Sequence, residues 1–342
     1  MDFLQAIVLG LIQGVYELFP LSSLGHTVLI PSWIGGNWAL LVKQESLSES
    51  PYLAFVVALH LANAIALVLF YLKEWVRLIV AFFRSLVRRR IETDTERLAW
   101  LIVVATIPVG ILGLLLEHTF RTFFAKPLAA ALFLTVNGVI LAAGEWYRRR
   151  APATPATPAT PATPATPATR PAAETPGSPE PAPGPAGADA ARGGAMSRLR
   201  DEHLVAIDEE AERALNAQIS WWSTLWIGAA QSLALLAGIS REGVAMVGGL
   251  YRGLSHENAM RFAFLLSAPV IFAAGALKVP DLLGPLGSGI RGQAIAGAAA
   301  AVVASLAAIF FLARYFKSHT LRPFAVYSVL FGVASIIRFG FF

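Results

Sequence analysis

The feature that most constrains this chain is a series of apolar blocks, each long enough to cross a lipid bilayer. Six such blocks occur, at residues 52–72, 98–116, 128–147, 259–279, 293–313 and 323–341. A membrane-spanning helix needs about 20 predominantly apolar residues, and a lone segment in hydrocarbon satisfies its backbone hydrogen bonds only as a helix. The composition agrees, because 56% of the residues are hydrophobic and 14% are charged. We therefore expect an all-α integral membrane protein with six transmembrane helices.

Four further apolar pieces are shorter or are interrupted by polar residues. They cover residues 3–16, 22–34, 219–236 and 243–252. A helix of 12 residues is about 18 Å long, which is short of a hydrocarbon core of about 30 Å. We expect these pieces to pair as two re-entrant helical hairpins, because irregular backbone at that depth must be covered by protein or line a wet cavity.

The basic residues predict how the chain is oriented. Segment 73–97, interpreted as a loop, holds seven Lys or Arg, and Arg148, Arg149 and Arg150 follow the third block. By the positive-inside rule, 73–97 and 148–218 are cytoplasmic. The net charge of +5 therefore indicates topology, and we expect no nucleic-acid partner. The chain has no cysteine, which excludes disulfides, zinc–thiolate sites and cysteine nucleophiles.

A proline-rich segment divides the chain. Residues 152–169 are six copies of Pro-Ala-Thr, within a Pro-, Ala- and Gly-rich stretch over 151–197. This composition is typical of an extended or disordered spacer, with a docking segment as the alternative. The predicted units are a first membrane repeat (1–147), a linker with a charged amphipathic helix (148–218) and a second membrane repeat (219–342). Three spans precede the linker, so the second half enters from the opposite side, as in an inverted-topology repeat.

The interrupted segments of the two halves align with each other. "IQGVYELFPLSSLGHTV" (12–28) lies over "AQSLALLAGISREGVAM" (230–246) with an offset of 218 residues. The offset places Gln13 on Gln231, Ser22 on Ser240 and Gly25 on Gly243. Paired, broken segments of this kind in an inverted repeat indicate a binding site near the membrane midplane.

The second segment predicts an anion site. Arg241 stays protonated, and its planar guanidinium suits phosphate. Ser22 and Ser240 precede the second helix of each hairpin, where hydroxyls and free backbone N–H groups form an anion cradle. We assign Ser22, Ser240, Arg241 and Gly243, together with Gln13, to substrate binding.

The first segment supplies candidate reactive groups. Glu17 can act as a base or hold a divalent cation, Ser23 can act as a nucleophile, and His26 can carry a proton. Ionisable groups within a membrane are costly and mark functional sites by default. Simpler structural interpretations stay open: a Glu17–Arg241 bridge, a helix cap at Ser22 and a packing role for His26. The same structural reading is favoured for four other residues: His60, Asn63, Asn137 and Glu145.

These motifs resemble those of the undecaprenyl-diphosphate phosphatases, the bacitracin-resistance family. "QGVYELFPLSSLGH" (13–26) is similar to the family's first signature, and "AGISREGVAM" (237–246) is similar to its second. The resemblance implies hydrolysis of undecaprenyl diphosphate to the lipid carrier of peptidoglycan synthesis. It also implies bacitracin resistance, a bacterial plasma-membrane location with a site open to the extracytoplasmic face, dependence on Mg²⁺ or Ca²⁺, and homodimers.

The resemblance also assigns roles to particular residues. Gln13 and Glu17 match the acidic motif, Ser22, Ser23 and His26 the hydroxyl–imidazole group, and Ser240 and Arg241 the phosphate-binding turn. Three positions depart from the family pattern: Gln13 replaces a second Glu of some members, Glu242 follows Arg241, and Ala245 replaces a common Thr. Glu242 either replaces the missing carboxylate as a metal ligand, beside Glu17, or weakens the phosphate site by repulsion.

Our leading hypothesis is a membrane phosphatase whose catalytic residues are Glu17, Ser23, His26 and Arg241. The alternative is a carrier that flips undecaprenyl phosphate or another anionic lipid, because inverted repeats with broken helices are a transporter design. The candidate base and nucleophile favour the enzyme, since a carrier needs neither. A sensory or scaffolding role rests on the linker alone.

Overall fold

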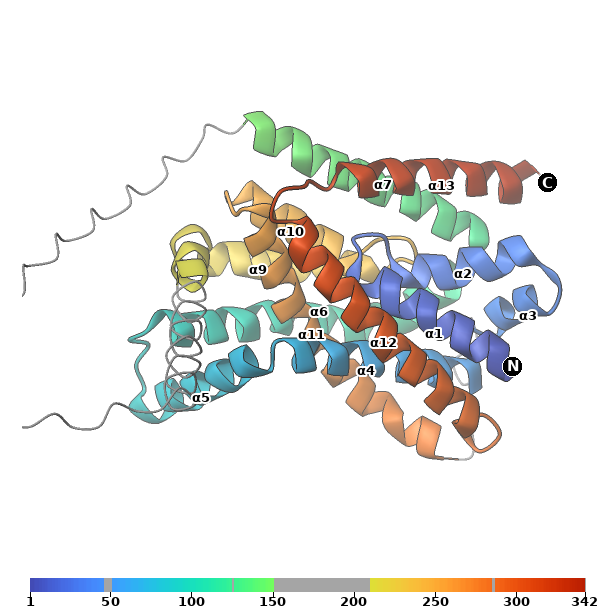
Figure 1. Ribbon diagram of the computed structural model, residues 1–342, viewed down its shortest axis with the longest axis horizontal. Helices are drawn as coiled ribbons and strands as arrows, with labels where there is room; N and C mark the ends of the chain where they lie inside the picture. The colour runs from blue at the N-terminus through green and yellow to red at the C-terminus, as the bar shows by residue number, and fades with distance from the viewer. Residues whose placement is uncertain (46–50, 125, 151–209, 285–286, 342) are drawn as a thin grey trace, which may run out of the picture.

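The computed structural model describes residues 1–45, 51–124, 126–150, 210–284 and 287–341, and within them the chain forms helices and no β-strand. The first half contains α1 (Phe3–Leu18), α2 (Ser23–Ile34), α3 (Gly36–Glu45), α4 (Pro51–Phe70), α5 (Leu72–Arg88), α6 (Asp94–Phe124) and α7 (Pro127–Arg150). The second half contains α9 (Trp221–Ala230), the 3₁₀ helix η1 (Gln231–Leu235), α10 (Arg241–Tyr251), α11 (His256–Leu283), α12 (Arg291–Tyr315) and α13 (Arg322–Phe341) (Figure 1). The predicted all-α class is confirmed, and the predicted spacer at 151–197 lies outside the described residues.

Several helices are long and apolar enough to cross a membrane. Five meet this condition individually: Asp94–Leu116 of α6, α7, His256–Gly275 of α11, α12 and α13. Helix α4 meets it only together with α5, and the two helices are bent by 87° at the break between them. The described residues thus hold five or six candidate spans, which agrees with a multi-pass membrane protein.

The segment 73–97 differs from its prediction as a loop, because most of it folds as α5. The sequence repeats apolar residues at helical spacing, with Leu72, Val76, Ile79 and Phe83 on one face. Basic residues occur so often in this segment that they lower its mean hydropathy. For this reason its composition predicts a charged loop. Periodicity, rather than composition, carries the helical signal here.

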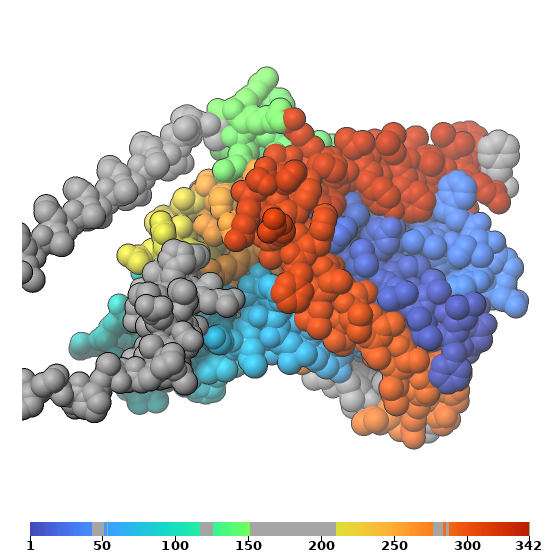
Figure 2. Space-filling model, viewed as in Figure 1, coloured from blue at the N-terminus to red at the C-terminus, as the bar shows by residue number. Residues whose placement is uncertain are grey.

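Small residues let helices of the two halves approach closely. On α1, a Cβ at Gly10 would lie 2.2 Å from the Gly297 carbonyl oxygen of α12, and one at Gly14 would lie 2.5 Å from that of Ala301. Both helices thus place small residues four apart at their contact, an arrangement that favours close packing in membranes. Figure 2 shows α12 crossing the face of the molecule towards the N-terminal end of α1. The first and second halves are therefore packed into each other.

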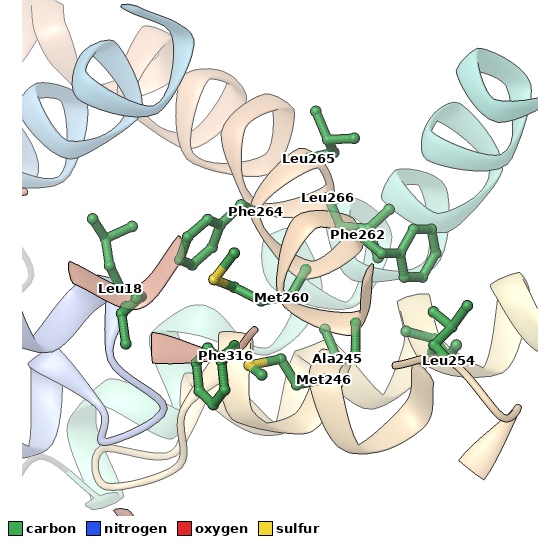
Figure 3. Packing of buried hydrophobic residues seen from close by; sticks show 14 of the residues in the cluster. Leu18, Ala245, Met246, Leu254, Met260, Phe262, Phe264, Leu265, Leu266 and Phe316 are labelled. Carbon is green, nitrogen blue, oxygen red and sulfur yellow. The ribbon is translucent and has the colours of Figure 1, made fainter. Parts of the chain in front are cut away.

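A hydrophobic core lies beneath the centre of the molecule. Leu18 at the end of α1, Met246 of α10 and Met260 and Phe264 of α11 are all buried in one cluster, which also includes Phe316 (Figure 3). Both halves contribute to it. This shared core fixes the ends of α1 and α10, where the candidate site residues lie.

The two pairs of short helices point towards each other. In Figure 1, α1 and α2 lie to the right of the centre and α9 and α10 to the left, and the turn of each pair lies near the middle. The turns consist of residues 19–22 and 236–240. They touch, because the Gly238 backbone N–H donates to Ser22 Oγ at 3.1 Å.

Gly238 provides a test of how tightly the second turn is held. Its φ is +116°, and a Cβ there would lie 2.5 Å from the Ala130 carbonyl oxygen and 2.6 Å from the Leu134 nitrogen of α7. Backbone strain of this kind costs about 1–3 kcal/mol, before any overlap is counted. We expect Gly238→Ala to lower the melting temperature of the detergent-solubilised protein. Gly113→Ala is the control, because a Cβ at Gly113 on α6 meets nothing within 4 Å; equal melting temperatures for the two variants would contradict the described packing of the turn.

Candidate active site

The contact between the two turns organises the candidate site. Ser22 Oγ accepts one hydrogen bond from the Gly25 N–H at 3.2 Å, within its own helix, and another from the Gly238 N–H of the opposite turn. A Cβ on Gly25 would lie 2.8 Å from the Gly238 Cα, so only glycine allows this approach. Ser22 itself adopts a φ of +67°, which is unusual for a residue other than glycine. The predicted substrate-binding role of Ser22 thus coexists with a structural one, namely joining the two turns.

Asn137 of α7 forms a second bridge between the turns. Its Nδ2 donates to the Pro20 carbonyl of the first turn at 2.9 Å, and its Oδ1 accepts from the Ser240 N–H of the second turn at 3.0 Å. The side chain is fully buried. The sequence predicts a packing role for Asn137, but its hydrogen bonds make it the residue that fixes the distance between the turns.

The two turns bring two helix N-termini together. Ser22 is the N-cap of α2, and Ser240 is the N-cap of α10, where its Oγ accepts from the Gly243 N–H at 3.0 Å. The first-turn N–H groups of a helix have no partners within the helix, and its dipole favours negative charge there. The predicted anion cradle is therefore consistent with the fold, and Gly243 belongs to the capped turn of α10.

Arg241 is the cation at this point. It begins α10, and its Nε and Nη1 are buried without a hydrogen-bond partner among the described residues. Hydrogen bonds to a charged group are strong, and leaving a buried charged donor unpaired is costly. No bridge between Glu17 and Arg241 occurs in the described part of the chain. An unpaired guanidinium at a helix N-terminus is the arrangement expected of a site that receives an anion.

Glu17 and Ser23 form the candidate base and nucleophile. The Ser23 hydroxyl donates to Glu17 Oε2 in a short contact, and Gln13 Nε2 donates to the same oxygen at 2.9 Å. All three side chains are buried. The structure thus brings together the predicted pair of Glu17 and Ser23, with Gln13 one helical turn before the carboxylate.

His60 of α4 also reaches Glu17, which sequence analysis did not foresee. Its Nε2 lies 3.4 Å from Glu17 Oε2, and its Nδ1 lies 2.9 Å from the Val56 carbonyl oxygen. A carbonyl oxygen only accepts, so Nδ1 carries a hydrogen and donates, and Nε2 donates to the Glu17 carboxylate when the ring carries a hydrogen on both nitrogens. The side chain is 25% exposed, whereas Glu17 is buried. No motif marks His60, because it comes from a different span; its position on one face of α4 with Asn63 is the only available signal.

His26 is hydrogen-bonded away from the Glu17–Ser23 pair. Its Nδ1 donates to the Ser22 carbonyl at 2.7 Å, and its Nε2 lies 3.0 Å from the Tyr327 hydroxyl. Tyr16 stacks on the imidazole with ring centroids 3.8 Å apart, and its hydroxyl lies 3.2 Å from that of Tyr327. His26 is therefore joined to the Ser22 turn and to two tyrosines, and no hydrogen bond to Glu17 or Ser23 occurs among the described residues.

Glu242 is buried beside this group. Its Oε1 accepts from the Ser267 hydroxyl of α11 at 2.8 Å, and its charge interacts with those of Glu17 and Arg241. The described residues hold no cluster of three or more His, Cys, Asp or Glu able to bind a metal. However, Gln13 Oε1 is buried without a partner next to the Glu17 carboxylate. Oxygen donors suit Mg²⁺ and Ca²⁺, and Mg²⁺ often takes only one or two carboxylates in addition to substrate phosphates, so the donor set fits a hard divalent cation.

Comparison with known proteins identifies the family of this chain. A sequence profile described as "Bacitracin resistance protein BacA" matches residues 6–164 and 194–334. The chain belongs to the bacitracin-resistance (BacA) family. The predicted family is confirmed, and both turns lie within the matched ranges.

Curated relatives in the BacA family match this chain over nearly its full length. Undecaprenyl-diphosphatase 2 of Frankia alni is 53% identical over 99% of this chain and 98% of its own length. Undecaprenyl-diphosphatase of Mycolicibacterium paratuberculosis is 47% identical over 98% of this chain and 97% of its own length. Undecaprenyl-diphosphatase 2 of Chromobacterium violaceum is 33% identical over 98% of this chain and 99% of its own length.

Asn137→Ala tests whether the spacing of the two turns matters in this BacA-family chain. The substitution leaves the Pro20 carbonyl and the Ser240 N–H without their buried partner, at a cost of about 1–3 kcal/mol for each group. We expect a lower melting temperature and a loss of turnover beyond what the remaining folded fraction explains. Asn63→Ala is the control, because Asn63 is equally buried but bonds α1 and α12 rather than the two turns. A purely structural Asn137 would lose turnover only in proportion to the unfolded protein.

Paired substitutions at His60 separate two roles for its contact with Glu17. Gln at this position can donate a hydrogen bond to the carboxylate but cannot carry a proton as imidazole does. If His60 orients Glu17, His60→Ala lowers kcat and His60→Gln restores most of it. We expect this result because a 3.4 Å contact to a carboxylate that already accepts two hydrogen bonds is suited to orientation. Equal losses in both variants would exclude an orienting role, and wild-type turnover in both would exclude any role.

Proposed function

We propose that this chain hydrolyses undecaprenyl diphosphate to undecaprenyl phosphate and inorganic phosphate. The product re-enters the lipid-carrier cycle of cell-wall peptidoglycan synthesis, and the activity confers resistance to bacitracin. The observation that carries the proposal is the pair of buried Arg241 nitrogens, Nε and Nη1, which have no partner among the described residues and lie at the N-terminus of α10, where the two turns meet. The names of the curated relatives agree with it.

The diphosphate binds where the two helix N-termini meet. Arg241 supplies a charged fork, and the first-turn amides of α2 and α10 supply neutral donors. Phosphoryl transfer depends mostly on positioning and on neutralising charge at the phosphate oxygens. A fixed pair of turns meets both needs, because its donors are already in place before the substrate arrives.

The attack begins at Glu17. Its carboxylate already accepts the Ser23 hydroxyl, so it removes the proton from the attacking oxygen, which is that of Ser23 or of a water in its place. The attacking oxygen bonds to the terminal phosphorus, and the bond from that phosphorus to the bridging oxygen breaks. If Ser23 attacks, water then hydrolyses the phosphoserine and regenerates the hydroxyl. The base and hydroxyl in contact favour hydrolysis over the alternative of a lipid carrier.

The departing lipid phosphate needs neutralisation. The predicted role of His26 as an acid requires a path through the Tyr327 hydroxyl, because its Nε2 faces that group. A divalent cation held by Glu17 and Gln13, with Glu242 nearby, would neutralise charge on the diphosphate oxygens. His60, as an imidazolium, would help to orient the Glu17 carboxylate through the same oxygen that Ser23 and Gln13 bond.

The same proposal includes the membrane arrangement. The helices α1, α2, α9 and α10 have 16, 12, 10 and 11 residues, which favours two re-entrant hairpins because a full span needs about 20. Their converging turns support an inverted-topology repeat around a midplane site. Basic residues of 73–97 and 148–218 favour a cytoplasmic location for those segments, and the family resemblance favours a site that opens to the extracytoplasmic face. Homodimers are part of the proposal through the family resemblance.

Phosphate release from undecaprenyl diphosphate by the purified, detergent-solubilised protein tests the function. We expect Arg241→Ala to lower kcat/KM by about 10²–10³, which is typical for loss of one donor to a developing anion. Ser23→Ala should be similarly impaired, and EDTA should reduce wild-type release in a way that added Mg²⁺ or Ca²⁺ restores. Arg252→Ala, at the opposite end of the same helix α10 and exposed, is the control and should match wild type. Full activity of Arg241→Ala would exclude this site, and no release by wild type combined with lipid translocation in vesicles would favour a carrier.

A further inference from the structure

Helix α5 exposes a wide apolar face that no part of the described chain covers. The exposed residues recur at helical spacing along one side: Leu72, Val76, Ile79, Val80, Phe83, Leu86 and Val87. The opposite side is buried against the rest of the protein through Leu78, Ala81 and Ser85, and through an ion pair between Glu74 and Arg261 of α11. Helix α5 is therefore fixed to the protein along one side and presents an apolar surface on another.

Basic residues form a stripe between these two sides. At 100° per residue, Lys73, Arg77, Arg84 and Arg88 fall on one narrow strip next to the apolar face. Arg89 and Arg90 follow at the end of the helix. An apolar face flanked by Lys and Arg is typical of helices that lie in the interface of an anionic membrane.

The direction of α5 agrees with that location. It leaves α4 at an angle of 87°. When α4 runs along the membrane normal, α5 lies parallel to the membrane surface. Its apolar face then meets acyl chains, and its basic stripe lies at the level of the headgroups.

A cleft of about 480 Å³ opens along this stripe, between α5, residues 93–95 and the helical residues 212–213. Val76 and Val80 of the apolar face form part of its lining, and so do three arginines, Arg77, Arg84 and Arg213. The cleft thus joins the apolar face to a group of cations. An anionic phospholipid matches this surface, because it combines a charged phosphate headgroup with apolar acyl chains.

The two carboxylates in the lining are already engaged. Glu212 accepts from Arg77 at 2.8 Å and from Thr95 at 2.7 Å, and Asp94 Oδ1 accepts from Asn216 at 3.1 Å. Arg84 is exposed on the basic stripe at the cleft. The lining therefore holds three arginines against two carboxylates, which gives the cleft a net positive charge.

We propose that this cleft binds the phosphate headgroup of an anionic phospholipid, whose acyl chains cover the exposed apolar face of α5. The lining shares no residue with the two turns of the candidate active site. It is thus a second lipid site, which holds a bilayer lipid rather than the substrate. One wall of the cleft is α5, and another is formed by residues 212–213, which lie shortly before the second membrane repeat. A lipid bound in the cleft therefore contacts both α5 and the chain that leads into the second repeat.

Lipid-dependent melting of the purified full chain in detergent tests the proposal, with phosphatidylglycerol and phosphatidylcholine as the probes. We expect phosphatidylglycerol to raise the melting temperature and phosphatidylcholine to have a much smaller effect. Each arginine near a membrane surface contributes roughly a fivefold change in affinity, so Arg84→Gln weakens the response and Arg84→Gln/Arg213→Gln abolishes most of it. The matched control Arg314→Gln/Arg338→Gln removes two exposed charges elsewhere and should respond like wild type. Counting retained phosphatidylglycerol by native mass spectrometry gives a second measurement at constant temperature.

Four outcomes overturn the proposal. These are equal responses to the two lipids, an unchanged response in Arg84→Gln/Arg213→Gln, and the same stabilisation by inorganic phosphate alone. The fourth is a response that appears only after residues 151–197 are deleted, which would mean that the chain itself fills the cleft. Phosphate release in detergent without added phospholipid should be the same for wild type and both double variants, since none of their substituted residues belongs to the catalytic turns.

Discussion

The structure depends on the contact between two turns that interrupt helices in the middle of the protein. One serine oxygen, Ser22 Oγ, accepts a backbone N–H from its own helix α2 and another from the opposite turn, and one amide, Asn137, bonds to both turns. Backbone that leaves a helix inside a membrane must find hydrogen-bond partners within the protein. Here each turn supplies partners for the other, and the glycines at positions 25 and 238 allow the approach. The two halves of the chain therefore satisfy part of each other's turn backbone.

The contact between the two turns also brings the proposed reacting groups together. Because the turns meet, two helix N-termini and the Arg241 guanidinium gather at one place, while α1 brings Glu17 to the Ser23 hydroxyl. The proposed anion site therefore lies beside the proposed base and nucleophile, although no one segment contains all three. The close packing of α1 against α12 through small residues holds α1, and with it Glu17, in a fixed position in the protein.

Much of this could be predicted from sequence. The apolar blocks, the short helices and the groups Glu17, Ser23, Ser240 and Arg241 all follow from local patterns, because helix length, turn chemistry and motif spacing are local properties. Residues from other spans could not be assigned in this way. His60, Tyr327 and Asn137 are single polar residues in apolar helices, and only tertiary packing decides whether such a residue reaches the site or another helix. Helix α5 was missed for the opposite reason, since its charge hid its periodicity.

Some of the unsatisfied polar groups among the described residues lie where the substrate is proposed to bind. Arg241 lacks a partner for two nitrogens, Gln13 Oε1 is unpaired, and Ser22 has a strained backbone. Each of these features would destabilise an isolated hairpin. They persist because Asn137, the close glycine contacts and the core around Leu18 hold the surrounding turns from several sides. An anion that binds here removes part of the destabilisation, so the same groups that weaken the empty fold increase its affinity for a phosphate. Packing around the site therefore fixes its residues in advance, while two Arg241 nitrogens within it stay without a hydrogen-bond partner until an anion binds.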